Sequence, residues 1–306
     1  MILLFSDPHI TENSIEELEE VFKEIYQVAI QNDKEISHII CLGDYYDKKH
    51  PTAKEIEFGT KWIIQFRERF DHFYMLRGNH PTIKDKVSSV EYLKYLGIKV
   101  MDELKFGNIF CGHFMCDKSK VFYGYYEKDR KLSDIKAKYI FLGHYHSFQQ
   151  LDKNAWHLGS VRFVTWNELN DKNKKIAIIS KGNQVKFINL KTPIKMKEVS
   201  SVNELSNLDS NLKVRIVYKD FNTFKNEVNE INKYKSKFKE LKIKLDFERT
   251  EKVKETKKTI NIQDLIDNWL KNIKDEEVKE ILENELKYLF PKENRYFETD
   301  NGNTVL

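Results

Sequence analysis

Residues 1–9 read MILLFSDPH, residues 38–47 read HIICLGDYYD, and residues 72–80 read HFYMLRGNH. Each stretch is a short apolar run followed by side chains that carry carboxylate, amide or imidazole groups. Such a run is typical of a strand that is buried on both faces. Residues 14–29 and 56–70, which separate the three stretches, place apolar side chains at helical spacing. The order strand, helix, strand, helix, strand predicts an α/β layered fold.

The rest of the chain divides into three further parts. Between 99 and 190 the pattern is mostly β, and one mixed sheet or two sheets packed face to face between helices would accommodate it. Around 192–211 the composition changes to Ser, Asn, Glu and Lys, which predicts a linker. Alternating apolar residues on both sides of a helical segment predict a small strand-helix-strand unit within 212–250. Two amphipathic stripes within 260–290 predict C-terminal helices.

Charge and cysteine content narrow the functional classes. The chain has 52 basic and 48 acidic residues and a net charge of +4, which is too small to indicate nucleic-acid binding by itself. Affinity for a polyanion must therefore come from local patches or bound metal. No run of about 18 apolar residues occurs, so we expect no membrane span. The cysteines Cys41, Cys111 and Cys116 have no framework spacing, which predicts reduced thiols in a cytoplasmic protein.

Residue types that bind metals follow five of the expected strands. They occur as Asp7-Pro8-His9, Gly43-Asp44, Gly78-Asn79-His80, Gly112-His113 and Gly143-His144-Tyr145-His146. Loops at the carboxyl ends of strands are where sites assemble in α/β folds, and glycine suits the tight turns that expose the next side chain. One such motif alone is more often a simple turn. Five in order, each closing an apolar strand, predict a metal site with oxygen and imidazole ligands.

This series resembles the motifs of the calcineurin-like metallophosphoesterase superfamily over roughly residues 1–190. The resemblance implies a mixed β-sheet sandwich flanked by helices and a site for two divalent metal ions. By motif position the ligands are Asp7, His9 and His146 for the first ion, Asn79, His113 and His144 for the second, and Asp44 for both. Oxygen and imidazole ligands without a thiolate suit Mn²⁺ better than a soft cation.

The resemblance also implies a reaction. Two metal ions about 4 Å apart lower the pKa of a bridging water and clamp phosphate oxygens, so that hydroxide attacks phosphorus in line. His80 is not needed as a ligand, and its motif position faces the leaving group, so we assign it proton donation or transition-state stabilisation. Asp47 is expected to orient a ligand or only to cap a turn, and His50 and Arg162 are candidates for the same support or for substrate contact. Pro81 stands where the family has Asp or Glu, which puts in doubt a hydrogen bond behind the ligands.

The segment Leu158-Gly159-Ser160-Val161-Arg162 resembles the Gly-Ser-x-x-Arg segment of SbcD-type DNA repair and recombination nucleases, some of them phage-encoded. That resemblance implies a nuclease domain at 1–191, a capping domain at 212–250, and helices at 260–290 that bind an SbcC-like ABC-type ATPase. The implied activity is Mn²⁺-dependent, with exonuclease action on duplex ends and endonuclease action on single strands. A homodimer is compatible with it, and the place of action would be the cytoplasm, or the host cytoplasm for a phage protein.

Other interpretations stay open. Lys48-Lys49 and Pro81 stand where the family's protein phosphatases carry Arg-Gly and Glu, which disfavours that branch. A small-molecule phosphodiesterase or phosphatase could use the appended unit as a lid. A catalytically silent scaffold would have no reason to keep every ligand. The terminal apolar stripes could pack on their own catalytic domain, and the lysines at 233–244 could form a solvated face or add salt-dependent DNA affinity.

Overall fold

The computed structural model of the chain describes all residues except 32–35, 80–87, 121–129 and 247–306. Met1–Phe247 forms one compact unit. The helices predicted at 260–290 and the last residues of the predicted capping domain lie outside the described residues. Within the described part, no helix is both long and apolar enough to cross a bilayer.

The first of three sheets is built on the apolar runs that open the chain. Its six strands are, in spatial order, β11 (Val185–Asn189), β10 (Lys175–Ile179), β1 (Ile2–Phe5), β2 (His38–Cys41), β3 (His72–Leu76) and β4 (Lys99–Met101). The strands β1 to β4 are parallel, whereas at one edge β10 pairs antiparallel with β1 and β11 pairs antiparallel with β10. The carboxyl ends of β1, β2 and β3 therefore lie side by side.

The second sheet packs face to face against the first. Its five strands are β5 (Leu104–Phe106), β6 (Ile109–His113), β7 (Tyr139–Gly143), β9 (Ala155–His157) and β8 (Gln149–Asp152). One buried cluster contains Leu4 and Ile40 from the first sheet together with Cys111 and Phe141 from the second. The predicted α/β fold with a mixed β-sheet sandwich is confirmed, and of the two arrangements left open by the sequence, two stacked sheets are present.

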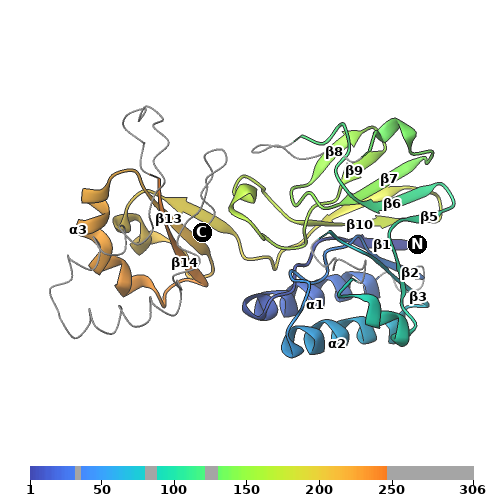
Figure 1. Cartoon of the computed structure of the whole chain (residues 1–306), viewed down its shortest axis with the longest axis horizontal. Helices are drawn as coiled ribbons and strands as arrows, with labels where there is room; N and C mark the ends of the chain where they lie inside the picture. The colour runs from blue at the N-terminus through green and yellow to red at the C-terminus, as the bar shows by residue number, and fades with distance from the viewer. Residues whose placement is uncertain (32–35, 80–87, 121–129, 247–306) are drawn as a thin grey trace, which may run out of the picture. The chain divides into compact units, whose positions relative to one another are not determined.

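Two long helices cover the other face of the first sheet (Figure 1). They are α1 (Ile15–Gln31) and α2 (Ala53–Arg69). Rings from both helices, Phe22 and Phe66, pack against Phe5 of β1. Burial of these apolar faces holds the helices on the sheet. Short 3₁₀ helices complete the connections: η1 (Glu12–Ser14), η2 (Glu91–Leu96), η3 (Leu132–Asp134) and η4 (Trp166–Glu168).

The third sheet forms the small unit that follows the sandwich. Its strands β12 (Met196–Val199), β13 (Lys213–Tyr218) and β14 (Glu240–Leu245) are all parallel. The helix α3 (Phe221–Ile231) and the turn η6 (Asn232–Tyr234) connect β13 to β14 and pack on one face of this sheet (Figure 1). A strand-helix-strand arrangement is present, as the alternating apolar residues predict.

The stretch predicted as a linker at 192–211 is instead structured. It contains β12 and the 3₁₀ helix η5 (Val202–Asn207). Val199, Val202 and Leu205 are buried in the core of the small unit. These three apolar residues are spaced among serine, asparagine and glutamate, so the average composition of the stretch conceals the buried face that they form.

Candidate metal centre

The seven predicted ligands come together where strands of both stacked sheets end. Asp7 and His9 follow β1, Asp44 follows β2, Asn79 follows β3, His113 ends β6, and His144 and His146 follow β7. The parallel register pairs Phe5 with Cys41 and His113 with Gly143. Because the neighbouring strands end level with one another, loops that are far apart in the sequence meet at one place.

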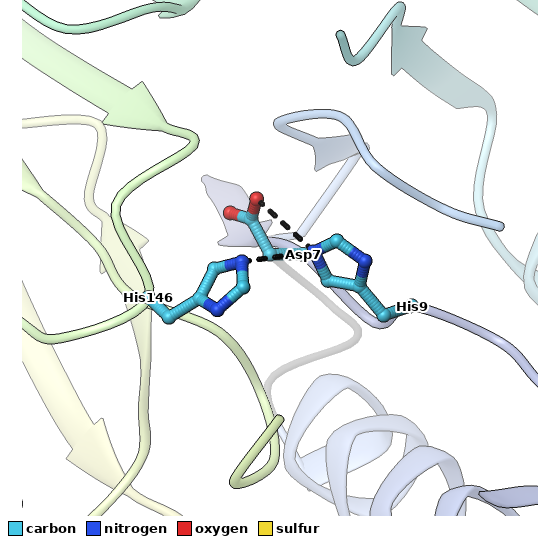
Figure 2. A group of neighbouring side chains, drawn as sticks. All are labelled: Asp7, His9 and His146. Carbon is cyan, nitrogen blue, oxygen red and sulfur yellow. Dashed lines mark hydrogen bonds and ion pairs between the residues drawn. The ribbon is translucent and has the colours of Figure 1, made fainter. Parts of the chain in front are cut away.

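The side chains form two groups. The ligand atoms of Asp7, His9 and His146 lie within 4.8 Å of one another, and we call these residues the first ligand group. The ligand atoms of Asp44, His113 and His144 also lie within 4.8 Å of one another, and we call these residues the second ligand group. Figure 2 shows the first group, in which the three side chains point toward one another and the Nε2 atoms of His9 and His146 are 2.9 Å apart.

Asp44 connects the two groups. Its Oδ2 atom lies 3.7 Å from His9 Nε2 and 3.2 Å from His113 Nε2. Asn79 joins the second group, since its Oδ1 atom is 3.1 Å from His113 Nε2 and 2.9 Å from His144 Nδ1. This donor set fits a divalent cation, because the carboxylates of Asp7 and Asp44 are at most 1% exposed and buried carboxylates need compensating positive charge.

The outer ring nitrogens of three imidazoles are held by hydrogen bonds. The Nδ1 atoms of the three rings donate as follows: His9 to Asp47 Oδ1 at 3.0 Å, His146 to Glu168 Oε1 at 3.3 Å, and His113 to the Leu42 carbonyl at 2.8 Å. A proton on Nδ1 leaves the Nε2 lone pair for a metal and fixes the ring orientation. Asp47 therefore has the supporting contact predicted for it.

Glu168 belongs to a buried ionic network that lies outside the five metal-ligand motifs of the sequence. Its Oε2 atom accepts hydrogen bonds from Lys174 Nζ at 2.6 Å and Ser160 Oγ at 3.1 Å, and Lys174 also donates to the His146 carbonyl at 3.1 Å. Burial alone raises the pKa of Glu168, but the hydrogen bond from His146 and the charge of Lys174 hold it well below its usual range. An ionised Glu168 keeps the His146 ring in place. The one sequence signal was the capping-box spacing of Thr165 and Glu168.

Arg162 supports the backbone of the first ligand group. Its buried guanidinium donates from Nε to the Pro8 carbonyl at 2.9 Å and from Nη2 to the His9 carbonyl at 2.7 Å. A contact between Arg162 and substrate stays a prediction.

His50 is exposed, and its predicted role at the substrate also stays a prediction. His80, the predicted proton donor, lies outside the described residues, as does its neighbour Pro81.

Four of the predicted ligands have left-handed backbone conformations. Their φ angles are 50° for Asp7, 48° for His9, 44° for Asp44 and 79° for His144. Positive φ is uncommon outside glycine and tends to occur at functional sites. Glycine is required beside them for close approach, because a Cβ at Gly78 would collide with the Asp44 carboxylate.

The buried charges act on the imidazoles in opposite directions. Burial lowers the pKa of His113, but the charge and hydrogen bond of Asp44 more than offset this and raise it to about 9. For His144, burial dominates and the pKa falls below its ordinary value. His113 thus carries a proton in the metal-free protein at neutral pH, and a divalent cation would replace that proton.

Two cavities adjoin the ligand groups. Asn79 and His113 line one of about 590 Å³, together with Arg77 and Phe114. Asp47 and Arg162 line the other, of about 670 Å³. Asp7 and His9 of the first group are almost fully buried, whereas Asn79 beside the second group is exposed. Asn79 is therefore an exposed edge of the second ligand group, whose Asp44 and His113 side chains are as buried as those of Asp7 and His9.

The calcineurin-like phosphoesterase family model matches residues 1–284. No protein of curated function matches the chain. Among solved structures, it is similar to an archaeal phosphodiesterase, at 16% identity over 62% of this chain and 99% of that one, with a TM-score of 0.37. It is also similar to the nuclease MPE of Pseudomonas putida, at 14% identity over 61% of this chain and 87% of that one, with a TM-score of 0.34.

The family match covers the loops that carry all seven ligands, both supporting carboxylates and Arg162. Members of this family are hydrolases that act on phosphoesters with divalent metal ions, and the two ligand groups provide donors of that kind. On the strength of this match, the chain belongs to the calcineurin-like phosphoesterase family.

Proposed function

We propose that this chain is a Mn²⁺-dependent nuclease that hydrolyses DNA phosphodiesters with two metal ions. The observation that carries the proposal is the position of Asp44, whose Oδ2 atom lies within 4 Å of an imidazole from each ligand group. One carboxylate shared between two sets of ligands is the arrangement that a pair of ions acting on one phosphate requires. Oxygen and nitrogen donors without a thiolate favour Mn²⁺ over a softer cation.

The residues of the chain divide the catalytic work. When bound, the ions would supply a hydroxide nucleophile and positive charge for the phosphate oxygens. Asn79 and His113 line the cavity of about 590 Å³, so the ester is proposed to enter beside the second ligand group. His80, next to Asn79 in the sequence, is proposed to protonate the leaving oxygen.

DNA as the substrate is supported by the Gly-Ser-x-x-Arg segment and by the small unit. Arg162 of that segment holds the Pro8 and His9 carbonyls, which makes the segment part of the catalytic apparatus. Lys54, Lys239 and Lys242 line the cavity of about 670 Å³, although Glu12, Glu16 and Glu240 line it as well. Lysines at this position would give a phosphate chain a salt-dependent affinity.

The proposal includes a partner and a cellular role. Helices at 260–290 are proposed to bind an SbcC-like ABC-type ATPase, with the nuclease acting in DNA repair or recombination. The cytoplasm is the proposed compartment. Cys41, Cys111 and Cys116 are free and buried, as suits a reducing environment.

A cleavage assay tests the activity. The full chain, stripped of metal with EDTA and reloaded with Mn²⁺, is incubated with end-labelled duplex DNA, circular single-stranded DNA and a phosphodiester dye. We expect hydrolysis of all three, a large loss in His80→Ala, and full activity in His72→Ala, which removes an exposed histidine at the start of β3.

The possible results separate the competing functions. Cleavage of the dye with both DNA substrates intact would refute the nuclease and support a small-molecule phosphodiesterase, for which the cavity of about 590 Å³ at Asn79 would be the binding site. Binding of Mn²⁺ without cleavage of any substrate, even with an added ATPase partner, would support a scaffold.

The partner is tested by deletion. Removing Asn261 to Leu306 should abolish binding to the ATPase and leave Mn²⁺-dependent hydrolysis of the dye unchanged. Insoluble or inactive protein would instead show that the terminal stripes pack on their own catalytic domain.

A further inference from the structure

A chain of buried charges runs from the metal-site loop to the small unit. It begins at Arg162, which is 7% exposed and donates to the carbonyls of Pro8 and His9. The Nη1 atom of the same guanidinium lies 3.9 Å from Glu17 Oε2. The planar guanidinium is rigid, so a force on Nη1 also moves the two nitrogens that hold the loop.

Glu17 is the centre of this chain. It extends from α1, is 7% exposed, and uses its two oxygens on different segments. Its Oε1 atom accepts a hydrogen bond from the Ile194 amide at 3.0 Å, and its Oε2 atom accepts one from Lys213 Nζ at 2.6 Å. Ile194 directly precedes the small unit, and Lys213 is the first residue of β13. A single carboxylate therefore meets the sandwich, the connection and the third sheet.

Lys213 and Arg162 need this carboxylate because they are close together and buried. Lys213 is 9% exposed, and its Nζ atom donates to the Phe163 carbonyl at 3.2 Å. Arg162 Nη1 lies 3.5 Å from the same carbonyl oxygen. Two buried cations that share one acceptor repel each other unless an anion lies between them. Glu17 is that anion.

We propose that Glu17 is a positioning residue for the first ligand group, coupling the β12-β13-β14 unit to the Asp7-Pro8-His9 loop through Arg162. Loss of the Glu17 charge leaves Arg162 and Lys213 opposed, which pulls the guanidinium away from the Pro8 and His9 carbonyls. Asp7 and His9 then lose their alignment with His146. The inference rests on the proposed metal-ligand role of these residues and does not depend on DNA as the substrate.

Mn²⁺ affinity tests the coupling. We expect the first ligand group to bind Mn²⁺ more tightly than the second. Isothermal titration of the metal-free full chain should show the affinity of this tighter site weakened about tenfold in Glu17→Gln, the lower end of the range for residues that orient ligands. The glutamine retains an oxygen for the Ile194 amide, whereas the charge and the acceptor for Lys213 Nζ are lost. With the dye, kcat should fall by a similar factor while KM stays unchanged. Lys213→Met leaves Glu17 to attract Arg162 alone, which draws Nη1 toward Glu17. This strains the hydrogen bonds to the Pro8 and His9 carbonyls, so Mn²⁺ binding should weaken about threefold.

Two matched controls remove an exposed charge from the same elements. Glu20→Gln lies on α1 and Lys197→Met on β12, and both should bind Mn²⁺ as the wild type does. A Glu17→Gln protein that melts at lower temperature but keeps its Mn²⁺ affinity and kcat would overturn the inference and leave Glu17 a purely structural role. If Glu17→Gln does not fold, unchanged Mn²⁺ affinity in Lys213→Met overturns it equally. A wild type that binds no Mn²⁺ would refute the ligand assignment and this inference together, whereas Mn²⁺ binding without DNA cleavage refutes only the nuclease.

Discussion

The two ligand groups differ in what holds them. In the first group, His9 and His146 each donate to a carboxylate, and Arg162 holds the loop backbone. In the second group, His113 donates to the Leu42 carbonyl, and His144 contacts the amide oxygen of Asn79. The backbone before His144 is held by neutral groups as well, since His157 Nδ1 donates to the Gly143 carbonyl at 3.0 Å and His157 Nε2 accepts from Ser119 Oγ.

This contrast teaches how one site can combine tight metal binding with access for substrate. Charged supports at the first group, Glu168 buried and Asp47 partly exposed, raise the basicity of its imidazoles and favour a firmly held ion. Neutral supports at the second group, beside an exposed Asn79 and a cavity, favour an ion that can adjust when a phosphate arrives. We therefore expect two Mn²⁺ affinities, with the higher one at the first group.

The largest effect on activity is expected at Asp44, which lies close to an imidazole from each ligand group. Asp44→Asn removes a carboxylate charge that lies between the two groups, so dye hydrolysis should fall on the order of 10³-fold, beyond the 10- to 100-fold typical of supporting residues. Electron paramagnetic resonance of added Mn²⁺ should show both sites weakened. Asp71→Asn, an exposed aspartate before β3, is the control. One site with unchanged affinity in Asp44→Asn would show that the carboxylate serves a single group.

Glu168→Gln should separate the two groups. The change removes the carboxylate behind His146 and leaves Lys174 paired with Asp171 alone, 2.8 Å away. Mn²⁺ affinity at the tighter site should fall about 10- to 100-fold, with the weaker site unchanged. Glu103→Gln, an exposed glutamate that pairs with Arg130, should bind both ions normally. Equal weakening at both sites in Glu168→Gln would mean that the charged supports serve the whole centre.

Acid should lower the stability of the folded protein through His157, which holds the backbone before His144. Burial lowers the pKa of His157 to about 4, against about 6.5 in the unfolded chain. The unfolded state therefore binds the extra proton, and stability is complete above pH 6.5 and is lost as pH falls toward 4. From pH 7.5 to pH 5 the loss should be about 2 kcal/mol. Urea unfolding in EDTA measures it, and His157→Gln should remove that part of the pH dependence. An unchanged pH dependence in the variant would place the acid sensitivity elsewhere.

Asp47→Asn should give the smallest change. The asparagine oxygen can still accept the hydrogen bond from His9 Nδ1, so this contact loses its charge and keeps its hydrogen bond, a difference of about 1 kcal/mol or roughly fivefold in Mn²⁺ affinity. Calorimetry at the tighter site is the measurement, with the exposed Asp134→Asn as control. A loss as large as that in Glu168→Gln would contradict the idea that burial of the support sets its importance.

The positions of the ligands, and of Asp47 and Arg162 behind them, could be predicted from sequence. The network of Glu168 and Lys174 and the contacts of Glu17 could not. Each ligand sits next to its own apolar strand, so local pattern places it at a strand end, and the resemblance assigned it to one of two ions. Glu168 and Lys174 are ordinary charged residues on a turn and a strand approach, and only folding buries them. Glu17 and Lys213 are 196 residues apart, a separation at which no local pattern relates two side chains.

The fold shows the same division. The two stacked sheets follow from short apolar runs, and the strand-helix-strand unit follows from alternation in β13 and β14. The structure of the segment at 192–211 does not follow from its sequence pattern. The strand β12 is only four residues long, and the buried side chains of the segment lie among polar ones. A short edge strand gains its order from the neighbour with which it pairs, and that neighbour is β13.

The left-handed residues at the centre have a consequence for selection on stability. Asp7, His9, Asp44 and His144 each hold a φ angle that glycine adopts without strain, at a cost of about 1 kcal/mol or more apiece. Glycine at any of these positions would relieve that strain and delete a ligand in the same step. A library of variants screened only for thermal resistance without metal would thus be enriched in proteins that fold well and have lost their chemistry.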